Sequence, residues 1–443
     1  MATLKILLIQ PSNKYAIKEN NPKIVEEVRG TNPPLGIMYL ASYLLMNTNH
    51  TVDIFDGQLF DNIDLAYTLN KGYDVVGISV LTFNLIDVIE TIKLIRRESP
   101  MSKIIVGGTH ATIYPKEMLQ WADIVVRGEG EQILLTVLKN LDSPQKIFAS
   151  RELEADLDKF PYPYRTHIDR YSSVFTRGKM TTMLTSRGCP FGCTFCFRPV
   201  VGRNLRIRSV QSVVNEIDMC VDRGINSFLI YDDTFTVNRQ RVLDICRGIE
   251  KNRLRIRFDV RTRVDMVDEE MLRSLRKAGM VRIKMGIESG VQRVLDRMNK
   301  GITLQQVKNA FKWCKKLRID TCGYIMVGNP GETREDIYET IRFTKALNPH
   351  YVHCAIFMPY PSTESYKEYV EKTGKDPWLD FARSPSEDFQ VPVWGDIPRE
   401  ELEKIVLKFY KEFYLRPSYI IKNIWKNPIN YIGAGIGLLK ENK

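Results

Sequence analysis

Residues 180–196 read Met-Thr-Thr-Met-Leu-Thr-Ser-Arg-Gly-Cys-Pro-Phe-Gly-Cys-Thr-Phe-Cys. The apolar and β-branched first part predicts a buried strand, and the glycine and proline that follow predict a loop. This loop carries Cys189, Cys193 and Cys196. Three thiolates so close together can surround one soft metal centre, so the stretch predicts a metal-binding loop at the end of a strand.

The number of clustered cysteines favours an iron–sulfur cluster over zinc. A structural zinc site takes four Cys or His ligands, and no fourth ligand lies nearby; His167 stands across a predicted linker. Three thiolates on a cubane cluster leave one iron with an open coordination position, as a catalytic cluster requires. The remaining cysteines stand apart in apolar or helical contexts, which predicts packing; they are Cys220, Cys246, Cys314, Cys322 and Cys354.

From Met180 onward, strand-like and helix-like segments alternate. The predicted strands are MTTMLTSRG, SFLIYDD, RFDVRTR, RIKMGIESG, TCGYIMVGNPG and YVHCAIFMPYP, with helical patterns such as VQSVVNEIDMCVDRG and EEMLRSLRKAG between them. Six βα-like units predict a partial, TIM-like (β/α)6 barrel over residues 180–377. Its active site is expected at the carboxyl ends of the strands.

Residues 1–141 show the same alternation with shorter strands. LKILLIQ, VDIFD, VVGISVL, KIIVGG and DIVVRG alternate with helical segments such as GIMYLASYLL and NLIDVIETIKLIRR. This pattern predicts a doubly wound, Rossmann-like parallel sheet with a ligand beyond the carboxyl ends of its strands. Residues 142–179, which include FPYPYR, predict a linker between two α/β domains, because the two prolines interrupt the periodicity.

Residues 378–443 form a tail with aromatic and basic residues at helical spacing. We expect a helical extension packed on the barrel; the alternative is a contact with a membrane surface or a lipid substrate. No apolar run is long enough to span a membrane, and the start lacks signal-peptide features. The cysteine pattern favours a reducing cytoplasm. The net charge of +11 is spread without long basic runs, so we expect no nucleic-acid partner.

The C-x3-C-x2-C spacing, with Phe195 before the last cysteine, resembles the radical S-adenosylmethionine (SAM) superfamily. Further motifs follow in the family's order: Arg206, Arg208-Ser209 with Glu216, Asp232-Asp233-Thr-Phe235, Arg263-Val-Asp265, Gly286-Ile-Glu288-Ser289-Gly290, Gly328-Asn-Pro330-Gly331-Glu-Thr333 and Pro359-Tyr-Pro361. The resemblance implies that Cys189, Cys193 and Cys196 bind a [4Fe–4S] cluster whose electron cleaves SAM to a 5′-deoxyadenosyl radical. It also implies SAM contacts from Phe195, Asp232, Arg263, Glu288 and Ser289.

The first domain resembles the cobalamin-binding domain fused to one branch of that superfamily. The resemblance rests on Pro33-Pro34-Leu35-Gly36-Ile-Met-Tyr39-Leu40, Gly107-Gly108-Thr-His110 and Arg127-Gly128-Glu129-Gly130-Glu131. It implies cobalamin contacts from Pro34, Leu35, Gly36, Leu81, Thr82, Gly107, Gly108, His110, Gly128, Glu129 and Gly130. Many such domains carry Asp-x-His-x-x-Gly, but Asp56-Gly57-Gln58 stands here without the histidine. The expected cobalamin is therefore bound in a His-off form.

The double resemblance implies a cobalamin-dependent radical SAM methyltransferase that methylates an unactivated carbon. Three alternatives stay open: a cobalamin-assisted cyclisation, oxidation or rearrangement; a radical enzyme without cobalamin; and a non-catalytic iron–sulfur or zinc module. The acceptor is a small molecule, lipid, peptide or protein. The electron donor is expected to be a flavodoxin or ferredoxin.

Overall fold

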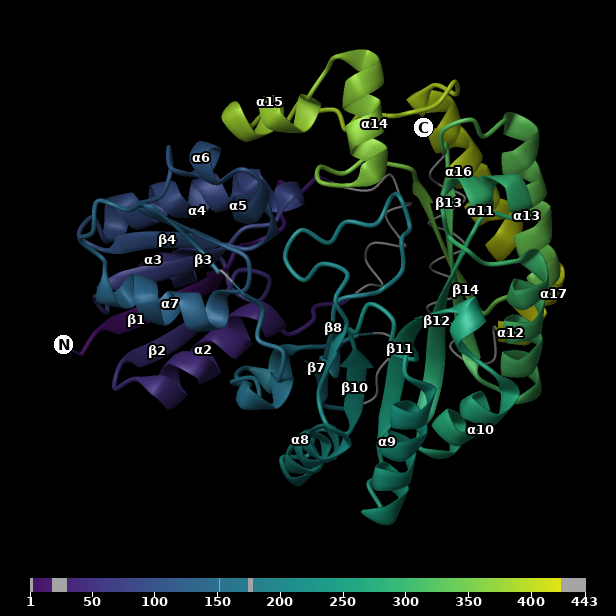
Figure 1. Cartoon of the computed structure of the whole chain (residues 1–443), viewed down its shortest axis with the longest axis horizontal. Helices are drawn as coiled ribbons and strands as arrows, with labels where there is room; N and C mark the ends of the chain where they lie inside the picture. The colour runs from purple at the N-terminus through teal and green to yellow at the C-terminus, as the bar shows by residue number, and fades with distance from the viewer. Residues whose placement is uncertain (1–2, 18–29, 151, 174–177, 424–443) are drawn as a thin grey trace.

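The structure is a computed structural model that describes residues 3–17, 30–150, 152–173 and 178–423. Two α/β domains lie side by side, with the N-terminal domain in purple to blue and the barrel in teal to green (Figure 1). The predicted architecture is confirmed: within the described residues each domain contains a six-stranded, all-parallel sheet. The last part of the tail, residues 424–443, lies outside the described residues, and so does the predicted membrane or lipid contact there.

The first sheet has the strand order β2-β1-β3-β4-β5-β6, so the chain reverses direction across the sheet between β1 and β3. Its strands are β1 Lys5–Gln10, β2 Thr51–Asp56, β3 Val75–Ser79, β4 Lys103–Gly107, β5 Ile124–Arg127 and β6 Ile147–Ala149. Helices cover both faces: α2 Leu35–Asn47, α3 Asn62–Leu69, α4 Leu85–Glu98, α5 Thr109–Ile113, α6 Pro115–Met118 and α7 Gly130–Lys139. Because β6 pairs with β5, the first sheet continues past the boundary at residue 141 into the predicted linker.

The second sheet is a partial barrel whose strands follow the order of the sequence. They are β7 Met180–Met183, β10 Ser227–Ile230, β11 Arg257–Arg263, β12 Met280–Glu288, β13 Asp320–Val327 and β14 Tyr351–Ile356. A short antiparallel pair, β8 Ser186–Arg187 and β9 Arg206–Ile207, brackets the cysteine loop. The outer helices are α8 Val210–Asp222, α9 Arg239–Lys251, α10 Glu269–Lys277, α11 Gln292–Arg297, α12 Leu304–Lys316 and α13 Arg334–Leu347.

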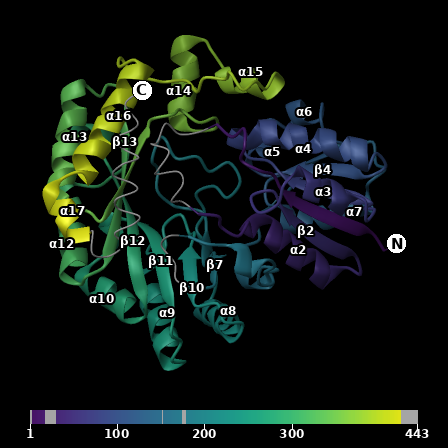
Figure 2. The same ribbon diagram turned by 180° about the vertical axis from the view of Figure 1, so that it is seen from behind.

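The segment after the barrel divides between the two domains. Helix α16 (Arg399–Tyr414) packs on β14, and α17 (Pro417–Asn423) follows it. Figure 2 shows α16 from behind, at the barrel end of the molecule. Helices α14 (Glu364–Thr373) and α15 (Pro377–Arg383) instead cross to the first domain, where Tyr366, Trp378 and Phe381 join its core. The predicted packing of the tail on the barrel is thus confirmed for α16, while α14 and α15 form a strap between the domains.

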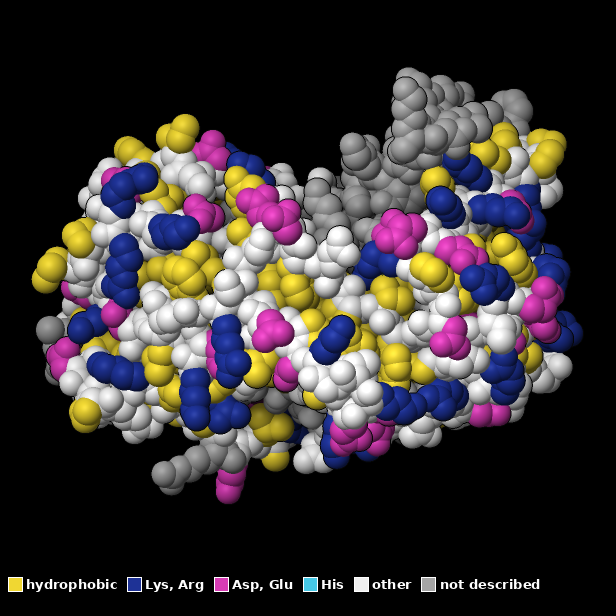
Figure 3. Space-filling view, turned by 90° about the horizontal axis from the view of Figure 1, so that it is seen from above, with side chains coloured by type: hydrophobic (Ala, Val, Ile, Leu, Met, Phe, Trp, Pro, Cys, Tyr) yellow, Lys and Arg dark blue, Asp and Glu magenta, His cyan; other side chains and the backbone are white. Residues whose placement is uncertain are grey.

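No described helix combines the length and the apolar character that crossing a membrane requires. On the face seen in Figure 3, basic and acidic side chains are interspersed over both lobes. Neither sign of charge therefore dominates this face.

The turn after β13 buries a carboxylic acid. Glu332 is 3% exposed, and its Oε2 accepts hydrogen bonds from the backbone N and the Nδ2 of Asn329, both at 2.9 Å. Within the described residues, Oε1 is buried and has no hydrogen-bond partner. Burial raises the pKa of Glu332 to about 7.

We predict that Glu332→Gln flattens part of the pH dependence of stability. The folded protein holds a proton that the unfolded chain releases above its ordinary pKa of 4.5, so stability declines as pH rises from 4.5 to about 7. The glutamine variant should lack this decline, which amounts to up to about 3 kcal/mol. Denaturant unfolding of both proteins at pH 5 and pH 8 measures the difference; equal declines in the two proteins would contradict it.

Candidate functional site

The cysteine loop leaves the barrel through a turn that requires glycine. Gly188 has a φ of 84°, and a Cβ there would lie 2.3 Å from the carbonyl oxygen of Asn204. The turn buries Cys189, whose Sγ lies 3.5 Å from the Oγ1 of Thr234. The first cysteine is therefore fixed directly above the strand ends of the barrel.

Hydrogen bonds from both sides hold the loop in place. Arg198 donates to the carbonyl oxygens of Cys189 and Phe191 at 2.5 and 2.8 Å. On the other side, the Thr194 backbone N–H donates to the carbonyl oxygen of Met298 at 3.0 Å. The thiols are thus presented by a loop whose backbone is positioned by the barrel.

The three thiols suit a cluster better than a single ion. Among the described residues, no three His, Cys, Asp or Glu side chains converge to hold one metal ion. A cubane binds each thiolate to a different iron, so its ligands need not converge on one point. Burial raises the pKa of the Cys196 thiol to about 11, and the Nη1 of Arg263 lies 3.6 Å from the Cys193 Sγ. Cationic iron offsets that burial cost, so the residues fit a [4Fe–4S] cluster.

Three of the predicted SAM residues gather beside this loop around Lys300. Its Nζ lies 2.6 Å from Glu288 Oε1 and 5.8 Å from the ring centre of Phe195, and its carbonyl oxygen accepts from Arg263. Glu288 has a φ of 59°, an uncommon conformation for glutamate that costs about 1 kcal/mol or more. Such local strain at the end of β12 is typical of a functional site.

The other two predicted SAM residues form hydrogen bonds with neighbouring residues of the protein. Asp232 is fully buried and accepts hydrogen bonds at 2.6 Å from the Thr185 backbone N, the Thr185 Oγ1 and the Ser186 Oγ. Ser289 shares a hydrogen bond of 3.1 Å with Thr340. Both lie at strand ends, where they fix the backbone that carries the site.

A cavity of about 310 Å³ lies between the two domains at the carboxyl ends of the first sheet. Its first-domain wall contains six of the predicted cobalamin residues: Gly36, Gly107, Gly108, Gly128, Glu129 and Gly130. Its barrel wall contains Ser186, Arg187, Gly188, Tyr231 and Asp233, next to the cysteine loop. Glycines leave backbone exposed to a ligand, so this wall fits a flat, bulky cofactor.

The remaining predicted cobalamin residues lie elsewhere in the described structure. Pro34, Leu35, Leu81, Thr82 and His110 do not line the cavity. His110 is fully buried, its Nδ1 lies 3.2 Å from Thr82 Oγ1, and burial lowers its pKa to about 3. The imidazole is therefore neutral and lies in the domain interior, where its ring centre is 5.2 Å from that of Tyr114.

A network of ion pairs closes the domain interface at the rim of the cavity. Arg187 bonds to Glu131 at 2.6 Å and to Glu129 at 3.1 Å, and Arg206 bonds to Glu129 at 2.5 Å. Burial opposes the charge of Glu129, but the two arginines outweigh it and hold the pKa of Glu129 below its ordinary value. Arg187 also lies over the ring of Tyr39, 5.2 Å from its centre.

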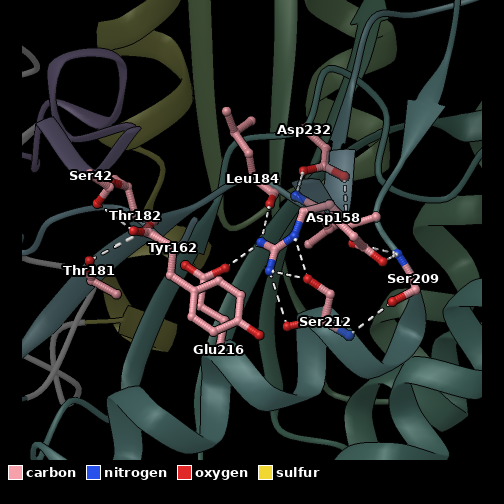
Figure 4. Close-up of polar contacts among 12 residues, drawn as sticks. Ser42, Asp158, Tyr162, Thr181, Thr182, Leu184, Ser209, Ser212, Glu216 and Asp232 are labelled. Atoms are coloured by element: carbon pink, nitrogen blue, oxygen red, sulfur yellow. Dashed lines mark hydrogen bonds and ion pairs between the residues drawn. The ribbon is translucent and has the colours of Figure 1, made fainter. Parts of the chain in front are cut away.

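A second buried carboxylate holds the first barrel strand. Glu216 of α8 bonds to Arg165 from the linker and to Arg208, which also donates to the carbonyl oxygen of Leu184 at 2.9 Å. Figure 4 shows Glu216 and Ser212 on the helix facing Leu184 and Thr182. Arg187 and Arg165 were not predicted from the sequence. The feature of the sequence that could have identified them is an arginine within or beside an otherwise apolar stretch that is predicted to be buried.

Comparison with known proteins agrees with both halves of the fold. The radical SAM superfamily model matches residues 183–344, and the B12 binding domain model matches residues 22–138. An uncharacterized methyltransferase from Pyrococcus horikoshii is 31% identical, with 96% of each chain covered. An anaerobic magnesium-protoporphyrin IX monomethyl ester cyclase from Rubrivivax gelatinosus is 27% identical over 89% of this chain and 76% of its own.

Solved structures share the fold at low identity. The methyltransferase TsrM from Kitasatospora setae matches with a TM-score of 0.69 and 19% identity, covering 84% of this chain and 76% of its own. The cobalamin-dependent radical enzyme OxsB matches with a TM-score of 0.71 and 19% identity, covering 98% and 70%.

The fold and the site together define an iron–sulfur enzyme with a partial barrel and a Rossmann-like domain. The chain belongs to the radical SAM superfamily, in the branch that carries a B12-binding domain before the barrel.

We predict that Arg187→Gln destabilises the protein by about 3 kcal/mol, because it leaves Glu129 and Glu131 buried with too few cations. Denaturant unfolding measures the loss. As a matched control, Arg334→Gln breaks an ion pair with Glu401 at the surface, where the two side chains are 55% and 35% exposed, and it should change stability little. Equal effects of the two variants would contradict a special role for the interface.

Proposed function

We propose that this protein is a cobalamin-dependent radical SAM methyltransferase that adds a methyl group to an unactivated carbon. The observation that carries the proposal is the shared cavity. One wall is the glycine-rich edge of the first sheet, and the other begins at Ser186–Gly188, the residues that lead into the cysteine loop. Two cofactors bound at these walls would face each other across a short gap.

When bound, the cluster supplies the electron that cleaves SAM and cobalamin carries the methyl group. The chain's part is to position them. Cys189, Cys193 and Cys196 would hold the iron. The charged side chains of Arg263, Lys300 and Glu288 lie beside the loop, where they would orient SAM. The buried domain interface would keep water from a radical formed there.

The names of relatives leave the acceptor open. They include a hopanoid methylase, bacteriochlorophyllide methyltransferases and a cytidylyl-2-hydroxyethylphosphonate methyltransferase, which are chemically diverse. The cyclase relative from Rubrivivax supports a second function, a cobalamin-assisted cyclisation without methyl transfer. We further propose a cytoplasmic location and a flavodoxin or ferredoxin as electron donor, because the cluster needs a low-potential reductant.

Turnover products separate the two functions. The methyltransferase should form S-adenosylhomocysteine and 5′-deoxyadenosine together, because one SAM gives the methyl group and a second gives the radical. Cyclisation would give 5′-deoxyadenosine without S-adenosylhomocysteine. Cys193→Ala should lose both products and most of its iron, whereas Cys246→Ala, a buried cysteine on α9, should keep both. Full activity of Cys193→Ala would contradict the assignment.

Cobalamin binding can be tested at Gly107. A Cβ at this position would meet Val126 at an ordinary 3.7 Å, so a side chain is tolerated by the backbone but enters the cavity wall. We predict that Gly107→Leu loses bound cobalt and keeps iron, and that Gly107→Ala keeps more cobalt than the leucine variant. Metal analysis after reconstitution with hydroxocobalamin measures both; unchanged cobalt in the leucine variant would place cobalamin elsewhere.

A further inference from the structure

Two neighbouring strands of the barrel, β11 and β12, carry charged side chains toward its interior. On β11 the odd-numbered residues Asp259, Arg261 and Arg263 alternate with Val260, which belongs to the core beneath the helices. On β12 the even-numbered Arg282 and Lys284 alternate with core residues in the same way. Since successive side chains of a strand point to opposite faces, these charges share the inner face of the sheet.

Most of these charges are matched within the protein. Lys284 Nζ lies 2.8 Å from the Asp259 carboxylate, and Arg282 lies 3.8 Å from the same group. Closer to the cysteine loop, Arg263 bonds to Asp265 at 2.9 Å. The carboxylates of the inner face are therefore already committed to neighbouring cations.

Arg261 is the exception. Within the described residues its guanidinium forms neither an ion pair nor a hydrogen bond, and its Nε is buried without a partner. Its Cζ lies 4.3 Å from the ring centre of Tyr231. Asp233, on the cavity wall, lies near enough for its pKa to be influenced by Arg261, but not within ion-pair distance. A half-buried guanidinium that is not neutralised favours an anionic ligand.

The residues around Arg261 suit a ligand that contains an unsaturated or aromatic group. Tyr231 lines the cavity between the domains, so Arg261 lies directly behind the wall where the proposed cofactors would meet. Tyr324 of β13 stands on the same inner face, and burial raises its pKa, so its hydroxyl stays a neutral donor. A phenol ring can pack against a ring of the ligand, while the phenol hydroxyl and the neighbouring cation bind the acidic substituent of that ring.

We propose that Arg261, flanked by Tyr231 and Tyr324, binds a carboxylate or phosphate group of the methyl acceptor. The acceptor is thereby assigned to the class of anionic molecules, and its anionic end would lie in the barrel with the reacting carbon toward the interdomain cavity. The inference rests on the proposed function. The same anion chemistry could come from the methionine carboxylate of SAM, and the experiment separates these two sources.

The test compares Arg261→Gln and Arg261→Lys with wild-type enzyme after anaerobic reconstitution. Calorimetric titration with phenyl phosphate, with benzoate, and with neutral benzyl alcohol measures anion binding, and titration with SAM measures cofactor binding. Arg257→Gln is the matched control, because Arg257 is an exposed arginine on the same strand. Iron content and melting temperature report whether each variant folds.

We expect at least one of the two anions to bind wild-type and Arg257→Gln enzyme more tightly than benzyl alcohol. Arg261→Gln should weaken the binding of that anion about tenfold or more, because a charged hydrogen-bond donor is lost. Arg261→Lys should weaken it less, because lysine keeps the charge but has a simpler set of donors. This loss should exceed any loss in SAM affinity at least tenfold. Anion affinity that is absent in wild type, or unchanged in Arg261→Gln, overturns the inference.

An equal loss of SAM affinity also overturns it, since Arg261 would then bind the methionine carboxylate. Failure of the proposed function looks different. In that case wild-type enzyme would release no 5′-deoxyadenosine with a chemical reductant, whatever the anion titrations give. If Arg261→Gln does not fold, the titration of Arg261→Lys tests the inference instead, because lysine keeps the charge but not the bidentate geometry.

Discussion

The contact between Arg187 and the two carboxylates Glu129 and Glu131 fixes how the domains face each other. Arg187 precedes the glycine turn into the cysteine loop, and the glutamates begin helix α7 at the edge of the first sheet. The same ion pairs therefore set the separation between the glycine-rich wall and the thiols. Because a buried arginine without its carboxylates is costly, the interface has one favoured arrangement rather than a range of hinge positions.

Much of the fold follows from local patterns. Alternation of short β-branched runs with helical periods predicted both sheets, and strand lengths differ from the expectation by a few residues. The strand β6 and the strap α14–α15 were not assigned correctly, for a common reason. Ile147–Ala149 is too short to stand out, and Trp378 and Phe381 show an apolar pattern without indicating which domain they cover. Tertiary contacts decide such assignments.

The part of the site whose chemistry depends on the spacing of residues along the chain could be predicted from the sequence. Three cysteines and a series of glycine turns have few alternative uses, and they lie where the pattern placed them. A carboxylate after a strand is less specific: Glu129 bonds to arginines across the interface, and Asp232 bonds to Thr185 and Ser186. Sequence shows that such a residue is near the site but not which partner it meets. Arg261 was missed because its meaning depends on neighbours from other strands.

The strap from the barrel back to the first domain has a consequence for biosynthesis. The core that contains Leu7 and Val76 also contains Trp378 and Phe381, which the ribosome adds much later. Until then, the apolar surface beside α6 that Trp378 and Phe381 cover is exposed, although the sheet and the helices on both of its faces can already form. Completion of that core is therefore delayed until most of the chain has emerged, and apolar surface left exposed during synthesis favours aggregation.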